Sequence, residues 1–330
     1  MRGRFWARRM SWNALVALCL LATPACQSPM NVPAATSAGV TLTASMPDLS
    51  GLAWIDGDLF LAVHDAKNRK EPDLPRVSLL TLPASSEGAL WRPVDVAFPD
   101  QASNDLESAA RIPGASQVLL AESGDNGGAF TRIFRAELRG DAVEILDAAR
   151  WSEFTKPYNV EAIAVAGNGP DEWLFIWAER NSGQISTDLK WTKLRLDPFR
   201  IGGTVSSIAF TLPQSAYDTR GAPLYSRPLV AMDIDSAGQI YIAAALDPEE
   251  ISQTPDNGPF RSIIYKIGGI DGDRVVLDPQ PRVIAVLDAL KVESLAVRER
   301  QDQRELFVGT DDENYGGILR LLPATEVQGP

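Results

Sequence analysis

One short phrase recurs five times along this chain of 330 residues, and it constrains the fold more than any other feature. Each copy begins with Leu or Val, carries Ser or Glu second in four cases of five, and continues as a mostly apolar run. The copies occupy residues 49–54, 106–111, 160–165, 229–234 and 292–297. Their second positions are 57, 54, 69 and 63 residues apart, which is typical of a repeat protein whose copies are supersecondary units.

Each copy of the phrase is followed by further β-type runs that are divided by Gly, Pro, Asp and Asn. Second strands are expected at residues 59–63, 118–121, 173–178, 240–245 and 306–310. Third strands are expected at residues 77–82, 133–138, 189–196, 262–267 and 318–322. Fourth strands are expected in four repeats, at residues 94–98, 143–148, 205–212 and 282–287. Almost no segment has a sustained 3.6-residue apolar period, so the pattern indicates an all-β protein.

The two ends of the chain complement each other in this count of strands. The fifth repeat stops near the C-terminus without a fourth strand, whereas residues 40–45 form a β-type run that belongs to no repeat. An N-terminal strand that completes the last blade of a β-propeller closes the ring and removes open sheet edges. We therefore predict a five-bladed β-propeller closed by the N-terminal strand. The alternatives are six blades, with the long fourth repeat divided, or another all-β architecture.

The first 26 residues have the order of an export signal. Four arginines precede an apolar run at residues 14–22, which is too short to span a bilayer, and small residues then lead to Cys26. We predict a lipoprotein signal with the lipid on Cys26, although Thr23 stands where such signals place Leu. Cleavage near Ala25 or Ala35, or an N-terminal helix that is retained, remains an alternative.

The composition of the segment after Cys26 indicates a flexible tether. Residues 27–38 are rich in Pro, Ala, Ser and Thr and carry no charge, which is typical of a flexible linker. Residues 39–330 would then form a single propeller domain. We expect the protein in the periplasm or cell envelope as a lipoprotein, or secreted if the lipid is absent.

Cysteine usage and charge restrict the chemistry of the exported part. The two cysteines are Cys19, inside the signal, and Cys26, so disulfides, thiolate metal sites and a cysteine nucleophile are excluded from the domain. Loss of the signal removes four arginines and no acids, and shifts the net charge from −12 to −16. The acidic surface excludes nucleic acid as an expected partner, and it either provides solubility or holds cations. We expect a monomer that binds a small anionic substrate or a protein ligand and meets the membrane only through its anchor.

The propeller prediction brings two sets of polar residues to one mouth of the central channel, because the first strand of a blade starts where its second strand ends. The inner set lies at the second position of the phrase and consists of Ser50, Glu107, Glu161, Val230 and Glu293. The outer set follows the second strands and consists of His64, Asp65, Glu122, Asp125, Asn126, Glu179, Arg180, Asn181, Asp247, Asp311, Asp312 and Asn314.

Three glutamates around one narrow axis repel one another, by about 2 to 4 kcal/mol per close pair at an effective dielectric constant near 20. A bound divalent cation would relieve this repulsion, and carboxylate and hydroxyl oxygens suit Ca²⁺ or Mg²⁺. We predict a metal site made by Ser50, Glu107, Glu161 and Glu293. The alternative is a wet channel in which water screens the charges or one glutamate keeps its proton.

At this point the sequence resembles two families. Residues 48–54, with the strand and charged turn that follow, resemble the phytase-like propeller family, also called "esterase-like activity of phytase". The axial pattern is similar to that of the calcium-activated nucleotidases, five-bladed propellers that hold one Ca²⁺ on the axis with serine and glutamate ligands. Val230 departs from that pattern, because it offers no oxygen. The resemblance implies a propeller, Ca²⁺ as cofactor and hydrolysis of phosphoesters.

Three functions follow as hypotheses. The first is a Ca²⁺-dependent hydrolase of phosphoesters or nucleotides, in which Glu122, Glu179 and Arg180 assist the metal at the mouth. The second is a non-catalytic envelope propeller that binds a protein or small ligand through the same face. The third is a Ca²⁺-dependent lactonase or esterase that uses His64, the only histidine, beside Asp65 as general base.

Four tryptophans on the expected strands have two possible roles. Trp54, Trp173, Trp177 and Trp191 are expected to pack between blades, with a platform for sugars as the alternative.

Overall fold

The computed structural model describes residues 46–66, 73–82, 90–124, 128–157, 159–180, 186–211, 228–246, 260–300, 303–311 and 316–323. The chain divides into two compact units, Met1–Thr36 and Ser37–Pro330, and every described residue belongs to the second. In that described part, no helix has the length and apolar character needed to cross a membrane. The signal, the tether and the closing strand at residues 40–45 lie outside it and stay predictions.

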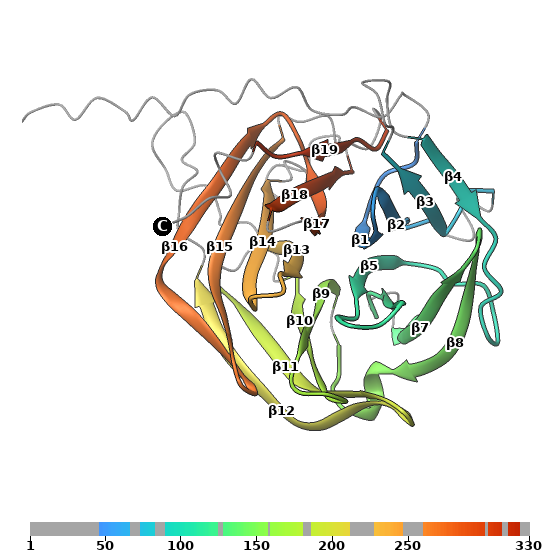
Figure 1. Cartoon of the computed structure of the whole chain (residues 1–330), viewed down its shortest axis with the longest axis horizontal. Coiled ribbons are helices and arrows are strands. Elements are labelled where there is room, and N and C mark those ends of the chain that lie inside the picture. Colours follow the sequence, from blue (N-terminus) through green and yellow to red (C-terminus); the bar gives the residue numbers. More distant parts are fainter. Residues whose placement is uncertain are drawn as a thin grey trace, which may run out of the picture. The chain divides into compact units, whose positions relative to one another are not determined.

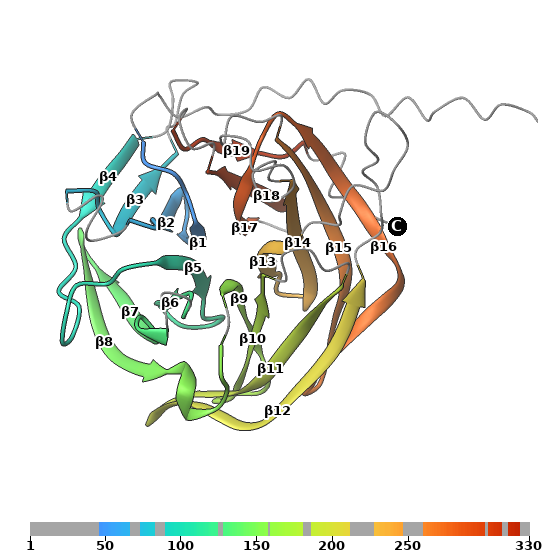
Figure 2. The same ribbon diagram turned by 180° about the vertical axis from the view of Figure 1, so that it is seen from behind.

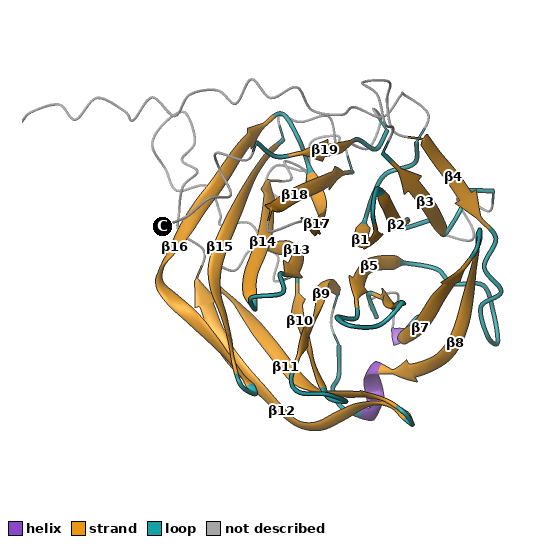
Figure 3. Ribbon diagram, viewed as in Figure 1, coloured by secondary structure: helices purple, strands orange, loops and turns teal. Residues whose placement is uncertain are grey.

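The described strands form five antiparallel sheets, or blades, around a central axis (Figures 1 and 3). Blade 1 contains β1 (Gly51–Asp56), β2 (Leu59–Val63), β3 (Val77–Thr81) and β4 (Leu90–Val94). Blade 2 contains β5 (Leu106–Arg111), β6 (Gln117–Glu122), β7 (Arg132–Arg139) and β8 (Ala142–Arg150). A short 3₁₀ turn, η2 (Trp151–Glu153), then leads to blade 3, which contains β9 (Val160–Gly167), β10 (Trp173–Glu179), β11 (Ser186–Leu196) and β12 (Phe199–Thr211). Blade 4 contains β13 (Leu229–Ile234), β14 (Gln239–Leu246), β15 (Arg261–Asp271) and β16 (Arg274–Asp288), and blade 5 contains β17 (Val292–Arg300), β18 (Gln303–Thr310) and β19 (Leu319–Leu321).

The first strands of the five blades line the centre of the ring, as the view from behind also shows (Figure 2). Each first strand contacts the first strand of the next blade, and β1 contacts β17. The prediction of a five-bladed propeller is therefore confirmed, and the six-bladed alternative is wrong. The fourth repeat is long because β15 and β16 form an extended hairpin rather than an additional blade.

Blade 5 has three strands among the described residues, and the segment that leads into β1 lies against it. The Leu49 amide donates to the Thr310 carbonyl at 2.9 Å, and the Gly317 amide donates to the Met46 carbonyl at 3.0 Å. The side chains of Met46 and Leu49 are buried in the same apolar cluster as Leu319. The chain thus enters blade 1 along the last blade, where a closing strand formed by the preceding residues would have to lie.

The hydrophobic core is divided into five layers, one between each pair of neighbouring blades. Side chains alternate between the two faces of a strand, so each blade packs apolar side chains against both of its neighbours. The inner strands are buried over most of their length. Trp54, Trp173, Trp177 and Trp191 all take part in such layers, so the packing role expected for them is confirmed.

One expected strand lies elsewhere than predicted. The fourth strand of blade 1 was expected at residues 94–98, but β4 is Leu90–Val94, with Leu90 paired to Thr81 and Val94 to Val77. This outer strand is mostly exposed, so it carries little apolar alternation from which its position could be read. Val96 and Phe98, which suggested the strand, instead pack on the layer between blades 1 and 2 after the strand has ended.

A β-bulge sits at the second position of the phrase in blades 2 to 5. The pairing register skips one residue between strands β5 and β6, β9 and β10, β13 and β14, and β17 and β18. The skipped residues are Glu107, Glu161, Val230 and Glu293. A bulge re-aims one side chain and bends the strand, so it gives this position its own direction at the start of each inner strand.

Candidate functional site

We define the acidic mouth as the end of the channel at which the inner strands begin. It comprises the side chains at the second phrase position together with polar groups just before the inner strands and just after the second strands. Its described members are Ser50, Asp65, Asp105, Glu107, Glu161, Arg180, Lys291, Glu293 and Asp311.

Blades 1 and 2 contribute a cluster of three carboxylates to this mouth. Ligand atoms of Asp65, Asp105 and Glu107 lie within 4.8 Å of one another. Asp65 follows β2, and its amide donates to the Ser50 hydroxyl at 3.0 Å. Asp105 precedes β5 with φ of 69° and accepts a hydrogen bond from the Ser123 hydroxyl. Aspartate tolerates this left-handed conformation better than most residues, which helps to place the carboxyl beside Glu107.

The spacing of this cluster fits a calcium ion. Ca²⁺ takes oxygen ligands at about 2.3 to 2.6 Å, so ligands on opposite sides of the ion lie roughly 5 Å apart. Three carboxylates with ligand atoms within 4.8 Å can therefore surround one such ion. Asp65 and Glu107 are partly exposed, so water could complete the coordination shell.

Blades 3 and 5 arrange their carboxylates differently, around arginine and lysine. Arg180, just after β10, has Nη1 at 3.4 Å from Glu161 and Nη2 at 3.9 Å from Glu293. Lys291, just before β17, has Nζ at 3.5 Å from both Glu293 and Asp311. Arg180 and Lys291 thus offset the charge of the two axial glutamates within the protein itself.

Glu161 has an unusual acidity for a glutamate. Burial raises the pKa of Glu161, Arg180 opposes this effect, and the negative charges of Glu293 and Asp105 add to it, so that the pKa is about 7. A carboxyl with a pKa near neutrality can donate or accept a proton at physiological pH. Its response to Asp105 shows that the two halves of the mouth are electrostatically linked.

The expected metal set is therefore divided by the structure. Glu107 joins Asp65 and Asp105, whereas Glu161 and Glu293 are outside that cluster and pair with Arg180. Ser50 accepts from the Asp65 amide and so supports the cluster from blade 1. Val230 is buried among apolar residues of blades 4 and 5 and brings no charge to the mouth.

His64 directly follows β2 at the acidic mouth, but its side chain is buried and does not face a substrate. Its ring is buried, with Nδ1 at 2.6 Å from the Asp48 carbonyl and Nε2 at 2.8 Å from the Ser78 hydroxyl. Because the carbonyl can only accept, Nδ1 carries the proton and Nε2 accepts from Ser78. Burial lowers the pKa of His64 to about 4, against the hydrogen bond to Asp48 and with the help of the Arg76 charge. His64 is thus buried with both ring nitrogens in hydrogen bonds, and its role as the general base of a lactonase or esterase stays a prediction.

Glu122 is also engaged below the mouth rather than open to a substrate. Its side chain is fully buried, and Arg132 Nη2 lies at 2.6 Å from Oε1. Oε1 also accepts from the Ser103 hydroxyl at 2.7 Å, and Oε2 accepts from the Arg132 amide at 2.9 Å. Arg132 also donates to the carbonyls of Pro99 and Gln101, so the buried pair is tied to the preceding loop.

Glu179, the remaining expected acid, lies at the end of β10 with Lys190 Nζ at 2.9 Å from Oε1. This pair joins β10 to β11 within blade 3, away from the carboxylate cluster named above. The other loop residues expected at the mouth, Asp125, Asn126, Asn181, Asp247, Asp312 and Asn314, lie outside the described residues.

Two residues of the mouth, Asp105 and Lys291, were missed by the sequence reasoning. Both stand immediately before a copy of the phrase, where the other copies have Asp48, Asn159 and Pro228. Extending the phrase by one residue would have found a polar position next to the axis. What the sequence could not have shown is that Asp105 joins Asp65 and Glu107, whereas Lys291 pairs with Glu293 and Asp311.

Comparison with known proteins shows no family for this chain. No protein-family model matches the chain, and neither does any curated protein. Among solved structures, a thermostable family-43 glycoside hydrolase is similar with a TM-score of 0.49 and 8% identity over 84% of this chain and 88% of that one. An α-L-arabinanase of Cellvibrio cellulosa, solved with arabinohexaose, has a TM-score of 0.49 and 12% identity over 84% and 91%. A gluconolactonase of Xanthomonas campestris has a TM-score of 0.38 and 11% identity over 85% and 88%. The resemblance to phytase-like propellers thus stays a prediction, and the residues of the mouth are the basis for inferring function.

Proposed function

We propose that this protein is a calcium-dependent hydrolase of phosphoesters that acts at the acidic mouth. The observation that carries the proposal is the cluster of Asp65, Asp105 and Glu107, whose ligand atoms lie within 4.8 Å of one another. This set replaces the axial set expected from the sequence. Carboxylate oxygens are the preferred ligands of Ca²⁺, and the nearby Ser50 hydroxyl fixes the backbone of Asp65.

In this proposal Asp65, Asp105 and Glu107 would hold the ion. A bound divalent cation supplies charge neutralisation for a phosphoryl group and makes a coordinated water more acidic. Glu161 is the residue best suited to move a proton, because its pKa of about 7 lets it exchange protons at neutral pH. Arg180 positions that carboxyl through its contact with Oε1.

Because the acidic mouth carries net negative charge, we expect the hydrolysis of an anionic substrate there to require calcium. The basic groups Arg180 and Lys291 lie beside carboxylates, at 3.4 Å from Glu161 and 3.5 Å from Glu293 respectively. An anionic substrate would therefore meet net negative charge unless a cation is present. A phosphoester should be turned over only with calcium, whereas a neutral ester would depend on it less.

Two measurements test the proposal. Calcium titration of the melting temperature should show stabilisation in the wild type and in Glu172→Gln, a partly exposed control in blade 3, but not in Glu107→Gln. Hydrolysis of an aryl phosphate and of nucleoside triphosphates, with an aryl ester as comparison, should then require calcium. If the wild type melts at the same temperature with and without saturating calcium, the metal site and the hydrolase proposal are both wrong.

A non-catalytic binding propeller is the second candidate. The observation that favours it is the placement of Arg180 between Glu161 and Glu293, which offsets axial charge without any metal. Calcium-dependent stabilisation without turnover of any phosphate or ester would decide for this function.

We also propose that the protein is exported and anchored in the cell envelope by lipid on Cys26. The order of arginines, apolar run, small residues and cysteine supports this proposal. Mass spectrometry of the mature N-terminus should find an acylated Cys26, and Cys26→Ser should move the protein from the membrane fraction to the soluble fraction. A mature chain that begins at another residue would contradict it.

A further inference from the structure

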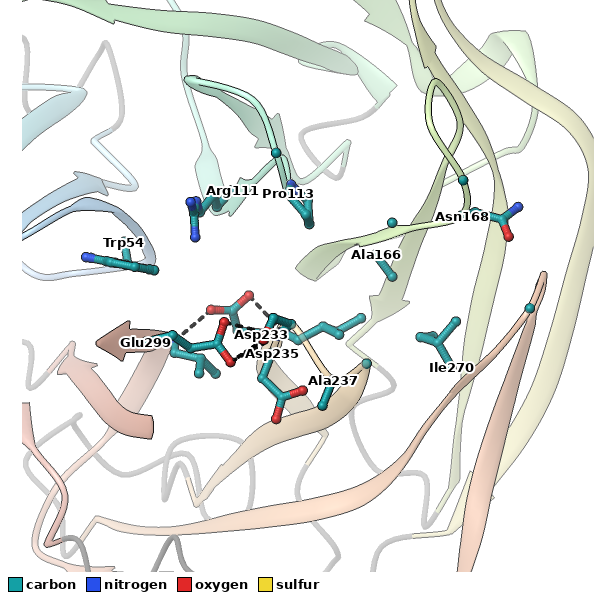
Figure 4. Close-up of a pocket in the computed structure, with 18 residues that line it drawn as sticks. Trp54, Arg111, Pro113, Ala166, Asn168, Asp233, Asp235, Ala237, Ile270 and Glu299 are labelled. Atoms are coloured by element: carbon teal, nitrogen blue, oxygen red, sulfur yellow. Dashed lines mark hydrogen bonds between the residues drawn. The ribbon is translucent and has the colours of Figure 1, made fainter. Parts of the chain in front are cut away.

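The channel has a second opening, at the end where the inner strands finish, and a cavity of about 730 Å³ lies there (Figure 4). All five blades line it, through Trp54, Arg111, Gly167, Asp233 and Val297, each at or near the end of an inner strand. We call this region the opposite mouth. It contains none of the residues to which the proposed hydrolase function is assigned.

Asp233 departs from the repeat at this mouth. The fifth position of the phrase is alanine in the other four copies, at residues 53, 110, 164 and 296. In the same blade the second position is Val230, where the other copies carry Glu or Ser. Blade 4 therefore has an apolar residue at the acidic mouth, where the other blades have a polar one. At the opposite mouth it has a carboxylate, where the other blades have alanine. Four blades accept alanine here, so the blade architecture does not by itself require an acid.

The Asp233 carboxylate is held in place by backbone amides. Oδ1 accepts from the Ile234 amide at 2.8 Å, and Oδ2 accepts from the Val297 amide at 2.7 Å. Each carboxylate oxygen can accept a second hydrogen bond. A fixed carboxylate with remaining acceptor capacity therefore lines the cavity.

Arg111 faces this carboxylate from blade 2. Its guanidinium carbon lies 4.5 Å from the centroid of the Trp54 ring, and Trp54 is itself fixed by a hydrogen bond from Nε1 to the Gly57 carbonyl at 3.2 Å. None of the described residues forms a hydrogen bond or ion pair with the Arg111 guanidinium. Stacking occupies the face of a guanidinium and leaves its in-plane N–H donors available, in the planar fork that suits a carboxylate.

The acidic side of the cavity is completed by Glu299. Its carboxylate accepts from the Ser236 hydroxyl at 2.8 Å and from the Ser236 amide at 3.1 Å, and Arg304 Nε lies 3.8 Å from Oε1. The Glu299 side chain keeps a partly exposed surface toward the cavity. The neighbouring Asp235 is committed elsewhere, because Arg304 Nε lies 2.8 Å from its Oδ2. Figure 4 shows Arg111 and Trp54 across the cavity from Asp233 and Glu299. The cavity therefore presents a guanidinium on one wall and carboxylates on the other.

We infer that the opposite mouth binds a small zwitterion, an amino acid or short peptide, with its carboxylate on Arg111 and its protonated amine toward Asp233 and Glu299. A purely anionic ligand would meet two carboxylates, and a purely cationic ligand would meet Arg111. The volume lies in the range of pockets for small molecules, about 300 to 1,000 Å³, and leaves room for side chains beyond the charged groups.

Isothermal titration with dialanine tests the inference, together with two forms that each lack one charge, N-acetyl-dialanine and dialanine amide. Dialanine should bind, and removal of either charge should weaken binding by about tenfold or more, because each charged group leaves a protein charge uncompensated. The inference is overturned if dialanine does not bind at millimolar concentration, or if the three forms bind equally.

Variants assign the two walls. Arg111→Lys keeps the charge but loses the planar fork, and should weaken dialanine by about tenfold while leaving dialanine amide unchanged. Asp233→Ala introduces the residue found in the other four repeats and should weaken dialanine while leaving N-acetyl-dialanine unchanged. Far-UV circular dichroism confirms that each variant folds, and Glu172→Gln is the matched control. Equal affinity of dialanine for the folded wild type, Arg111→Lys and Asp233→Ala would refute the site.

Discussion

The two mouths of the channel are built from the same five strands but handle charge in different ways. At the acidic mouth, carboxylates recur at one phrase position and are compensated by neighbouring basic groups, as in the contacts of Arg180 with Glu161 of its own blade and Glu293 of blade 5. At the opposite mouth a single arginine, Arg111, stacks on Trp54 and faces Asp233 across a cavity. The difference teaches that the repeat builds the framework, whereas departures from the repeat build the candidate ligand site.

Removal of the buried pair below the acidic mouth should have the largest effect. Arg132→Ala would leave the fully buried Glu122 without its guanidinium, and breaking such a pair costs about 3 to 5 kcal/mol. Urea unfolding would measure the loss. Arg195→Ala, which removes an exposed partner of Glu172, is the control and should cost less than about 1 kcal/mol. Equal losses in both variants would show that the pair does not support the mouth.

Calcium should distinguish the two mouths. At a concentration about a hundred times the dissociation constant, a ligand that binds only the folded state stabilises it by about 2.7 kcal/mol. Asp105→Asn should lose most of this stabilisation, whereas Asp233→Ala at the opposite mouth should keep it. Thermal unfolding with and without calcium provides the measurement, and loss of the calcium effect in Asp233→Ala would contradict the separation of the two sites.

Arg180 at the acidic mouth and Arg111 at the opposite mouth should contribute unequally to the free energy of unfolding. Arg180→Ala would leave Glu161 and Glu293 without their shared partner, at a cost of about 1 to 3 kcal/mol. Arg111→Ala would lose the contact with the Trp54 ring, worth about 0.5 to 1 kcal/mol, together with the positive charge that lowers the pKa of Asp233. Chemical denaturation of both variants would compare them, and a larger loss in Arg111→Ala would reverse the assignment of structural and ligand-binding roles.

Each mouth contains one carboxyl that titrates near neutrality, which predicts a shared pH dependence. Burial raises the pKa of Glu161 and of Asp233 to about 7, from ordinary values of 4.5 and 3.8. Between the ordinary and the raised pKa the folded state binds more protons than the unfolded state, so the free energy of unfolding falls as pH rises through this window. Glu161→Gln and Asp233→Asn should each flatten that decline, by a few tenths to about 1 kcal/mol per pH unit.

Urea unfolding at a series of pH values from 4 to 8 would test this. Curves of wild type and variants that run parallel over the whole range would mean that neither carboxyl has a raised pKa.

The sequence by itself determined the ring and the positions that face its axis. Five copies of one phrase, each followed by β-type runs, predict five blades, because a repeating strand pattern buries its apolar faces only against copies of itself. The same pattern placed Glu107, Glu161 and Glu293 at one mouth, and their bulges show that this position is distinct in the backbone as well.

The tertiary structure alone decided which charges meet. Asp65 and Glu107 belong to different blades, and so do Arg180 and Glu293, so no spacing along the chain indicates that they lie within ion-pair or ligand distance. Burial likewise separated His64 and Glu122, which are engaged in the framework, from the carboxylates of the mouth. Periodicity specifies the direction of a side chain, whereas its pKa and its partners depend on desolvation and on charges brought together by neighbouring blades.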